Sequence, residues 1–261
     1  MPRFSANLGF MWPDRPLLDR IDAAGRAGFK AIELHWPYDV PAEAVRAATI
    51  RNGVSLLGIN TVRGDVAKGE FGLGALPGRE ADFQAAVDQS IAFCLGSGAT
   101  AIHCMAGVVR DDQRQAARTV LLENLERAAA KAGPHGLTIL LEPLNPRDAP
   151  GYFYSTVAAG ADIIAGLGAA NIKLMFDCYH VGVSEGDILK KLERYLPLIG
   201  HVQIAAVPSR AEPDEGEIAY GAIFAGLDRI GYAGWVGCEY RPRKGTDEGL
   251  AWVKRLGVSL G

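Results

Sequence analysis

The segment IKLMFDCYH, residues 172–180, passes from apolar, strand-forming residues directly to the acidic residue Asp177. Three other segments also place a polar residue after a short apolar run: TILLEPLN at 138–145, HVQIAAVPSR at 201–210 and WVGCEYRPR at 235–243. The four polar residues are Glu142, Asp177, Gln203 and Glu239, and they recur at intervals of 35, 26 and 36 residues. Each interval is about the length of one strand and one helix. This spacing predicts parallel strands that present polar side chains at the same end.

Outward from these segments, strand-like apolar runs alternate with helical periodicity along the whole chain. We predict eight strands, at residues 4–10, 31–37, 55–61, 100–107, 138–144, 172–178, 201–206 and 235–240. Intervening segments place apolar residues three and four apart and finish at glycine, as helices do, for example 17–28, 42–53 and 121–133. Near-continuous apolar strands joined by helices indicate a parallel sheet buried on both faces. The predicted fold is α/β, a single (β/α)8 TIM barrel that forms one domain over residues 1–261.

The competing fold is an open, doubly wound sheet. That fold would need a glycine-rich phosphate loop after the first strand, and NLGFMW at 7–12 is not one. In a barrel, reactive residues project from the carboxyl ends of the strands. Glu142, Asp177, Gln203 and Glu239 would then come from strands five to eight and face one another around one half of the barrel mouth.

Composition favours a small molecule as the partner. The chain has 261 residues, is 49% hydrophobic and carries a net charge of −3 with both signs interspersed. Because it has neither a basic face nor a polybasic run, we expect no nucleic-acid partner and no membrane partner. The four cysteines lack zinc-site spacing and are expected to be reduced core thiols. No leader pattern and no membrane-length apolar run is present, which predicts a cytoplasmic protein.

The four strand-end residues predict a metal site. A single glutamate such as Glu142 would usually be a solvated loop residue, but three carboxylates and an amide need a reason to converge. Oxygen ligands of this kind suit Mg²⁺ or Mn²⁺ better than a soft metal. We therefore predict that Glu142, Asp177, Gln203 and Glu239 bind a divalent cation.

Two further residues are predicted to bind substrate. His180 follows Asp177 by three residues, where it can face a substrate oxygen. Arg210 follows Gln203 by seven, and its guanidinium could clamp a carboxylate. Ordinary alternatives are a structural histidine and an ion pair within the acidic loop after residue 210. His201 shares the strand parity of Gln203, which favours packing or support of the metal ligands. The glycine-rich segment 64–80 is either a lid or a connector.

Several segments together resemble the hydroxypyruvate isomerase family of xylose-isomerase-like barrels. They are FSANLGF at 4–10, GDVAKGEFGLGALPGRE at 64–80, LLEPLNPRDAPGYF at 140–153, FDCYH at 176–180, GHVQIAAVPSRAEPDEGEIAY at 200–220 and GCEYRP at 237–242. The resemblance covers most of the chain. It implies that Glu142 and Glu239 are the paired catalytic acid and base, with Asp177 and Gln203 as companion metal ligands.

Two segments depart from the pattern of that family. Strand three continues into INTVRGD, where the family commonly has an apolar-proline segment before Gly-Asp. Strand two ends in LHWPY, where a phenylalanine is expected in place of His35-Trp36. Both departures lie at the predicted barrel mouth. They therefore bear on the substrate rather than on the chemistry.

The resemblance implies isomerisation of hydroxypyruvate and tartronate semialdehyde through an enediolate, with a small 2-oxo or hydroxy acid as substrate. A metal would stabilise the enediolate while the two glutamates remove and return the proton. Alternatives on the same scaffold are a 2-oxo-tetronate-type isomerase and a ketose 3-epimerase. Phosphodiester hydrolysis by an endonuclease-like barrel would need more histidines and a basic surface, and a silent sugar-binding barrel could keep every ligand. The sequence does not determine the oligomeric state, and both a monomer and a homo-oligomer are compatible with it.

Overall fold

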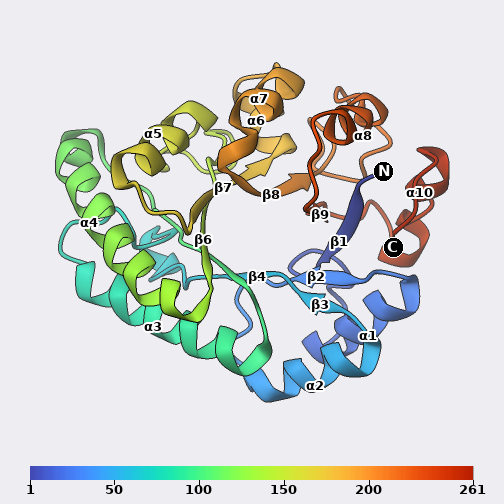
Figure 1. Ribbon diagram of the computed structural model, residues 1–261, viewed down its shortest axis with the longest axis horizontal. Coiled ribbons are helices and arrows are strands. Elements are labelled where there is room, and N and C mark those ends of the chain that lie inside the picture. The colour runs from blue at the N-terminus through green and yellow to red at the C-terminus, as the bar shows by residue number, and fades with distance from the viewer. Residues whose placement is uncertain (261) are drawn as a thin grey trace.

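The computed structural model describes residues 1–260 and shows a barrel of parallel strands surrounded by helices (Figure 1). The sheet order is β3-β2-β1-β9-β8-β7-β6-β5-β4, and every neighbouring pair is parallel. The strands are β1 (Arg3–Asn7), β2 (Ala31–Glu33), β3 (Ser55–Leu56), β4 (Gly58–Asn60), β5 (Ala101–His103), β6 (Thr138–Leu141), β7 (Ile172–Asp177), β8 (Ile199–Ile204) and β9 (Trp235–Cys238). The predicted TIM barrel is confirmed.

The third predicted strand is divided in two at Leu57, which makes nine strands from eight segments. On one side β3 pairs with β2, and on the other β4 pairs with β5. Leu57 bridges the two neighbours, because its amide donates to the Ile32 carbonyl at 2.8 Å and its carbonyl accepts from the Thr100 amide at 3.2 Å. Backbone hydrogen bonds therefore continue around the barrel through this interruption.

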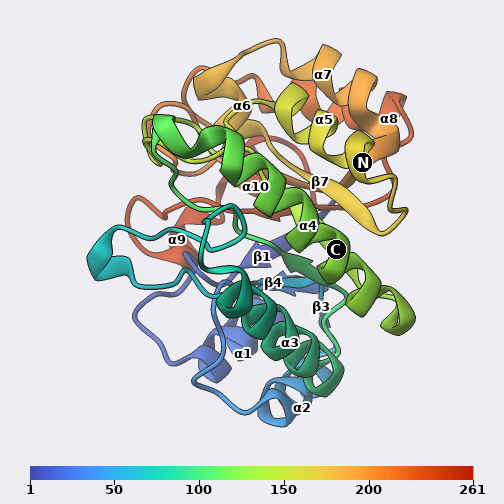
Figure 2. The same cartoon turned by 90° about the vertical axis from the view of Figure 1, so that its left-hand side faces the viewer.

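Helices separate successive strands along the chain. They are α1 (Leu17–Ala27), α2 (Ala42–Asn52), α3 (Glu80–Ser97), α4 (Arg114–Ala132), α5 (Val157–Leu167), α6 (Cys178–Ser184), α7 (Ile188–Tyr195), α8 (Tyr220–Arg229), α9 (Thr246–Gly249) and α10 (Trp252–Arg255). Short 3-10 turns occur at Val66–Lys68, Asp111–Gln113, Gly133–His135 and Leu196–Leu198. Figure 2 shows the barrel from the side, with α3 and α4 lying across the strands.

Glycine ends the first two predicted helices but not the third. Gly28 and Gly53 follow α1 and α2 with φ of 103° and 59°, the left-handed conformation that glycine adopts at little cost. Gly133 instead keeps a helical φ of −56°, so α4 continues into a 3-10 turn that ends at Gly136 with φ 69°.

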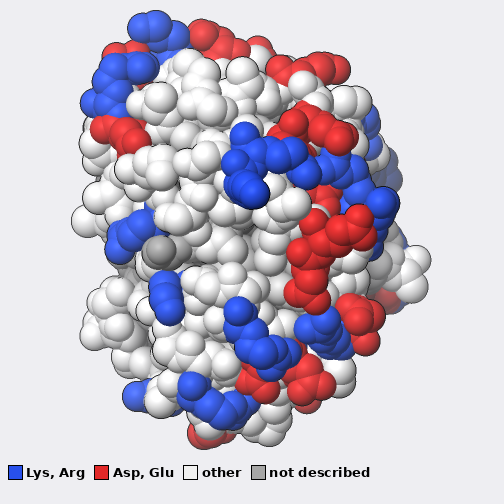
Figure 3. Space-filling view, turned by 90° about the vertical axis from the view of Figure 1, so that its right-hand side faces the viewer, with Lys and Arg blue, Asp and Glu red and all other residues white. Residues whose placement is uncertain are grey.

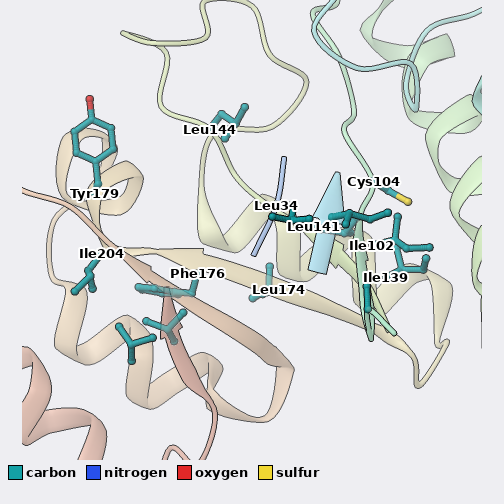
Figure 4. Packing of buried hydrophobic residues seen from close by; sticks show 14 of the residues in the cluster. Leu34, Ile102, Cys104, Ile139, Leu141, Leu144, Leu174, Phe176, Tyr179 and Ile204 are labelled. Atoms are coloured by element: carbon teal, nitrogen blue, oxygen red, sulfur yellow. The ribbon is translucent and has the colours of Figure 1, made fainter. Parts of the chain in front are cut away.

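The core fills the space between the strands and the helices. Figure 4 shows buried side chains from successive strands packed together, among them Ile102, Ile139, Leu141, Leu174 and Phe176. Strands in a parallel sheet are covered on both faces, which explains why their sequences are almost entirely apolar. All four cysteines are buried and unpaired.

The surface carries charges of both signs. On the face shown in Figure 3, acidic and basic side chains lie next to one another around a broad uncharged area. Within residues 1–260, no helix combines the length and the hydropathy needed to cross a membrane.

The glycine-rich segment 64–80 is tied to the loop after β5. The amides of Leu73 and Gly74 both donate to the Met105 carbonyl, at 3.2 and 3.0 Å. Gly72 has φ 118°, and a Cβ atom there would lie 2.6 Å from the Met105 backbone. Close backbone approach therefore requires glycine at position 72.

Candidate active site

A cavity of about 350 Å³ opens at the carboxyl ends of the strands. Glu142, His180, Arg210 and Glu239 all line it. A larger cavity, of about 420 Å³, lies toward the opposite end of the barrel, where Thr138, Ile199 and Trp235 begin their strands. Barrel enzymes place their chemistry at the carboxyl ends of the strands, which identifies the smaller, carboxylate-lined cavity as the candidate active site.

The barrel strands bring the four predicted strand-end residues close together. Asp177 is the last residue of β7 and pairs in register with Gln203 of β8. Gln203 in turn pairs with Gly237 of β9, two residues before Glu239, so these side chains share one face of the sheet. Glu142 directly follows β6. The predicted placement on consecutive strands therefore matches the observed geometry.

Side-chain contacts join the four residues into one cluster. The amide nitrogen of Gln203 donates to Glu239 Oε2. Arg210 Nη2 lies 3.0 Å from Glu239 Oε1 and 3.8 Å from Asp177 Oδ2. His180 Nε2 lies 3.5 Å from Glu142 Oε1 and 3.6 Å from Asp177 Oδ2. Acid, amide, imidazole and guanidinium groups from four consecutive strands and their loops thus meet in one place.

Three oxygens in this cluster are buried without a hydrogen-bond donor. Glu142 Oε1, Asp177 Oδ2 and Gln203 Oε1 have no hydrogen-bond partner among residues 1–260. Buried oxygens normally find a donor, and three unsatisfied ones at one site are a reason to expect a cation. Carboxylate and amide oxygens are the donor set of a hard divalent ion. The residues present therefore fit Mg²⁺ or Mn²⁺.

Two local features orient these oxygens. Asp177 caps the N-terminus of α6, because its Oδ1 accepts from the Tyr179 amide at 2.8 Å and leaves Oδ2 facing the cluster. The amide nitrogen of Gln203 donates to Glu33 Oε2 at 2.7 Å. Since one end of the amide is held by Glu33, the carbonyl oxygen is the end left without a partner.

His180 belongs to the same group of candidate ligand atoms as Glu142 and Asp177. Its Nδ1 accepts from the Asn145 backbone amide at 3.0 Å, so a neutral ring carries its proton on Nε2. Burial, with the Arg210 charge, lowers the pKa of His180 well below its usual value, which keeps the ring neutral. Nε2 is therefore a hydrogen-bond donor toward the cavity rather than a free lone pair for a metal.

Burial raises the pKa of both central carboxyl groups. For Glu142, burial and then the charges of Glu239 and Asp177 raise the pKa well above its usual value. For Asp177, burial raises the pKa to about 7 against the opposing charge of Arg210. Carboxylates crowded in a low-dielectric site share protons unless a cation compensates them.

Arg210 has a more internal position than its place in an acidic loop suggested. Its guanidinium lies between the rings of Phe10 and Tyr179, at 5.1 and 4.9 Å from their centroids. It forms ion pairs with Glu239 and Asp177. The loop residue Glu212 instead forms an ion pair with Arg243, at 2.8 Å.

Glu33 lies directly below the cluster and was not among the residues predicted from the sequence. It accepts hydrogen bonds from Ser5 at 2.7 Å and Gln203 at 2.7 Å, and His201 Nε2 lies 3.0 Å from it. Burial opposes ionisation of Glu33, but the charge and hydrogen bond of His201 hold the pKa of Glu33 below its usual value. Asn7 links this layer to the cavity through Glu239 at 3.1 Å. The sequence feature that could have indicated Glu33 is its charge within the otherwise apolar run AIEL, residues 31–34.

Comparison with known proteins identifies a barrel family and two relatives named as isomerases. A family described as "Xylose isomerase-like TIM barrel" matches residues 21–256. A Cupriavidus necator protein named 2-oxo-tetronate isomerase is 48% identical over 255 residues, covering 97% of this chain and 98% of its own length. A Mus musculus protein named "Putative hydroxypyruvate isomerase" is 43% identical over 260 residues, covering 97% and 94%.

A solved structure also matches over nearly the full length. It is described as an AP endonuclease, family 2, from Brucella melitensis, and it superimposes with a TM-score of 0.95 at 39% identity, covering 98% of this chain and 99% of the other. The resemblance to the hydroxypyruvate isomerase family and the prediction of an enzyme with isomerase activity are confirmed by the two named relatives. The chain belongs to the xylose isomerase-like TIM barrel family.

Proposed function

We propose that residues 1–261 act as one catalytic domain, a Mg²⁺- or Mn²⁺-dependent isomerase of short 2-oxo acids. The observation that carries the proposal is the set of unpartnered buried oxygens on Glu142, Asp177 and Gln203. Glu142 lines the candidate cavity together with Glu239, and the side chains of Asp177 and Gln203 contact residues that line it. Among substrates, 2-oxo-tetronate has the better support, because relatives at 48% and 40% identity carry that name. Hydroxypyruvate, the substrate expected from the sequence, is the second candidate.

The reaction moves a proton between adjacent carbons. One glutamate of the pair Glu142 and Glu239 removes the proton from the hydroxyl-bearing carbon, which leaves an enediolate. The other returns a proton to the former carbonyl carbon, while the proton of the neighbouring hydroxyl group passes to the former carbonyl oxygen, and the two glutamates exchange roles in the reverse direction. Asp177 and Gln203 complete the oxygen ligands for the divalent cation, which when bound supplies positive charge near the substrate oxygens.

His180 and Arg210 are the proposed substrate-binding residues. The Nε2–H of His180 faces the cavity and can donate to a substrate oxygen as negative charge develops there. Arg210 lies beside both Glu239 and Asp177, so its charge also stabilises the ionised form of the carboxylates that must accept a proton or a metal.

The test is turnover of 2-oxo-tetronate and hydroxypyruvate by protein loaded with Mg²⁺ or Mn²⁺, measured in deuterium oxide. Deuterium incorporation at the carbon next to the carbonyl is expected, together with loss of turnover on chelation. Faster turnover of a neutral ketose than of either acid would favour the 3-epimerase alternative. Absence of deuterium exchange with all of these substrates would favour a binding protein.

The similarity to the Brucella melitensis AP endonuclease structure raises endonuclease activity as a second candidate. Its expected chemistry uses a multi-zinc cluster with many His and Asp ligands, together with a basic surface. Within residues 1–260, the candidate metal group contains one histidine, His180, and the net charge of the chain is −3. We expect no cleavage of abasic-site DNA above the metal-only background. Cleavage that increases with the amount of added protein and is lost in Glu142→Gln would instead make endonuclease activity the first candidate.

A further inference from the structure

Three arginines line the candidate active site, and only one is half-buried without a counter-ion. Arg210 is ion-paired with Glu239 at 3.0 Å and with Asp177 at 3.8 Å. Arg241 is exposed, with its guanidinium 5.3 Å from the centroid of the Phe10 ring. Arg63 is half-buried, and no carboxylate within residues 1–260 lies within 4.0 Å of its guanidinium nitrogens.

Arg63 is held in place by contacts that leave its hydrogen-bond donors free. Its guanidinium carbon lies 4.1 Å from the centroid of the Trp36 ring. Trp36 is itself fixed, because its indole nitrogen donates to the Thr61 carbonyl at 3.0 Å. The Arg63 carbonyl accepts from the Gly72 amide at 2.8 Å, which anchors its backbone to the glycine-rich segment. A guanidinium held over an aromatic ring keeps its N–H edges available.

We propose that Arg63, positioned by Trp36, binds the substrate carboxylate and selects 2-oxo acids over neutral sugars. The inference rests on the proposed function, because it assumes that the reacting carbons lie at Glu142 and Glu239. The cavity is lined by the buried carboxyl groups of Glu142 and Glu239 and by the more exposed guanidinium groups of Arg63 and Arg241. It therefore fits a molecule with a carboxylate at one end and hydroxyl or carbonyl oxygens next to it. A guanidinium fork matches both oxygens of a carboxylate, which a hydroxyl group cannot do.

The two sequence departures at the barrel mouth belong to this one contact. Trp36 lies in LHWPY and Arg63 lies in INTVRGD, and the two segments follow different strands. Their side chains meet over the cavity. The contact therefore joins the ends of two different strands at the mouth of the cavity, where a substrate enters.

The test compares binding of glycerate with binding of glyceramide, a neutral molecule of the same shape. Neither has a carbonyl group that the proposed reaction could isomerise, so calorimetry on the metal-loaded protein measures affinity without turnover. Arg63→Met keeps the apolar stem and removes the charge, and Arg241→Met is the matched control at the same cavity. We expect Arg63→Met to weaken glycerate binding roughly ten- to a hundredfold, the typical value of a charge-assisted contact. Glyceramide binding should be unchanged.

Arg63→Lys retains a charge without the planar fork, so its glycerate affinity should fall between those of the wild type and Arg63→Met. Wild-type glycerate affinity in Arg63→Met, or an equal loss in Arg241→Met, would overturn the assignment to Arg63 while leaving the acid substrate class intact. Equal affinity of the wild type for glycerate and glyceramide would instead reject the acid substrate class, and the Arg63 proposal with it.

Discussion

Asp177→Asn should change the pH dependence of stability of the metal-free protein. Asp177 is buried, and its pKa is raised from 3.8 to about 7. An acid with a higher pKa in the folded state binds its proton more tightly when folded. Its contribution to stability is therefore complete below pH 3.8 and is lost as pH rises to about 7. At 1.36 kcal/mol per pKa unit, the full loss is about 4 kcal/mol.

Asparagine removes this titration and preserves the local structure. Its side-chain oxygen can still accept from the Tyr179 amide, which keeps the cap of α6. Relative to Asp177→Asn, the wild type in the presence of a chelator should lose about 3 kcal/mol of unfolding free energy between pH 5 and pH 8. The prediction concerns the change of this stability difference with pH and not its absolute value, because the substitution also removes the contact with Arg210 at 3.8 Å.

The assay is denaturant unfolding of both proteins at several pH values, with chelator and with Mn²⁺. At a Mn²⁺ concentration one hundred times its Kd, the wild type should gain about 2.7 kcal/mol. Asp177→Asn lacks a proposed ligand and should gain much less. A stability difference in chelator that stays constant from pH 5 to pH 8 would refute the electrostatic reasoning. Equal stabilisation of both proteins by Mn²⁺ would refute the role of Asp177 as a ligand.

Three other predictions concern catalysis, support of the ligands and the glycine-rich segment. Glu142→Gln and Glu239→Gln should each lower kcat at least about 100-fold while the protein still unfolds in one cooperative transition, because an amide cannot transfer the proton; near-wild-type turnover in a steady-state assay would contradict this. Glu33→Gln should raise the Mn²⁺ dissociation constant roughly 10- to 100-fold, measured by calorimetry, because Glu33 orients the Gln203 amide; unchanged affinity would make Glu33 a packing residue. Gly72→Ala should destabilise the protein by more than ~1 kcal/mol in denaturant unfolding. Gly78→Ala is its control, since Gly78 also has a positive φ, 84°, but nothing lies within 4 Å of an added Cβ; equal losses would show that backbone conformation, not close approach, sets the cost.

The barrel was predictable from sequence because its strands are buried on both faces. Runs such as TILL and IKLMF have few polar residues, and the helical segments between them repeat at three and four residues. The break at Leu57 was not predictable. It depends on which residue of strand three pairs with each neighbour, and the apolar pattern SLLGIN is the same with or without the break.

Strand-end placement located the candidate site, but it could not supply the partners of each group. Glu33 and Gln203 are 170 residues apart and meet only through the closure of the barrel. Arg210 lies in a loop with many acidic residues, yet its shortest ion pair is with Glu239 of the next strand unit. The protonated nitrogen of His180 is set by the backbone amide of Asn145, and a sequence does not show such a contact.

Charge balance explains how these separate observations fit one site. Four buried carboxylates meet here, those of Glu33, Glu142, Asp177 and Glu239, and each burial is costly without compensation. Two basic groups lie against them: Arg210, and His201, whose pKa Glu33 holds above its usual value despite burial. If all four carboxyl groups are ionised and both basic groups are charged, the net charge of the cluster is −2, which one divalent cation would balance. A substrate acid would add one more negative charge, and Arg63, half-buried and without an ion pair among residues 1–260, lies on the same cavity and can balance it.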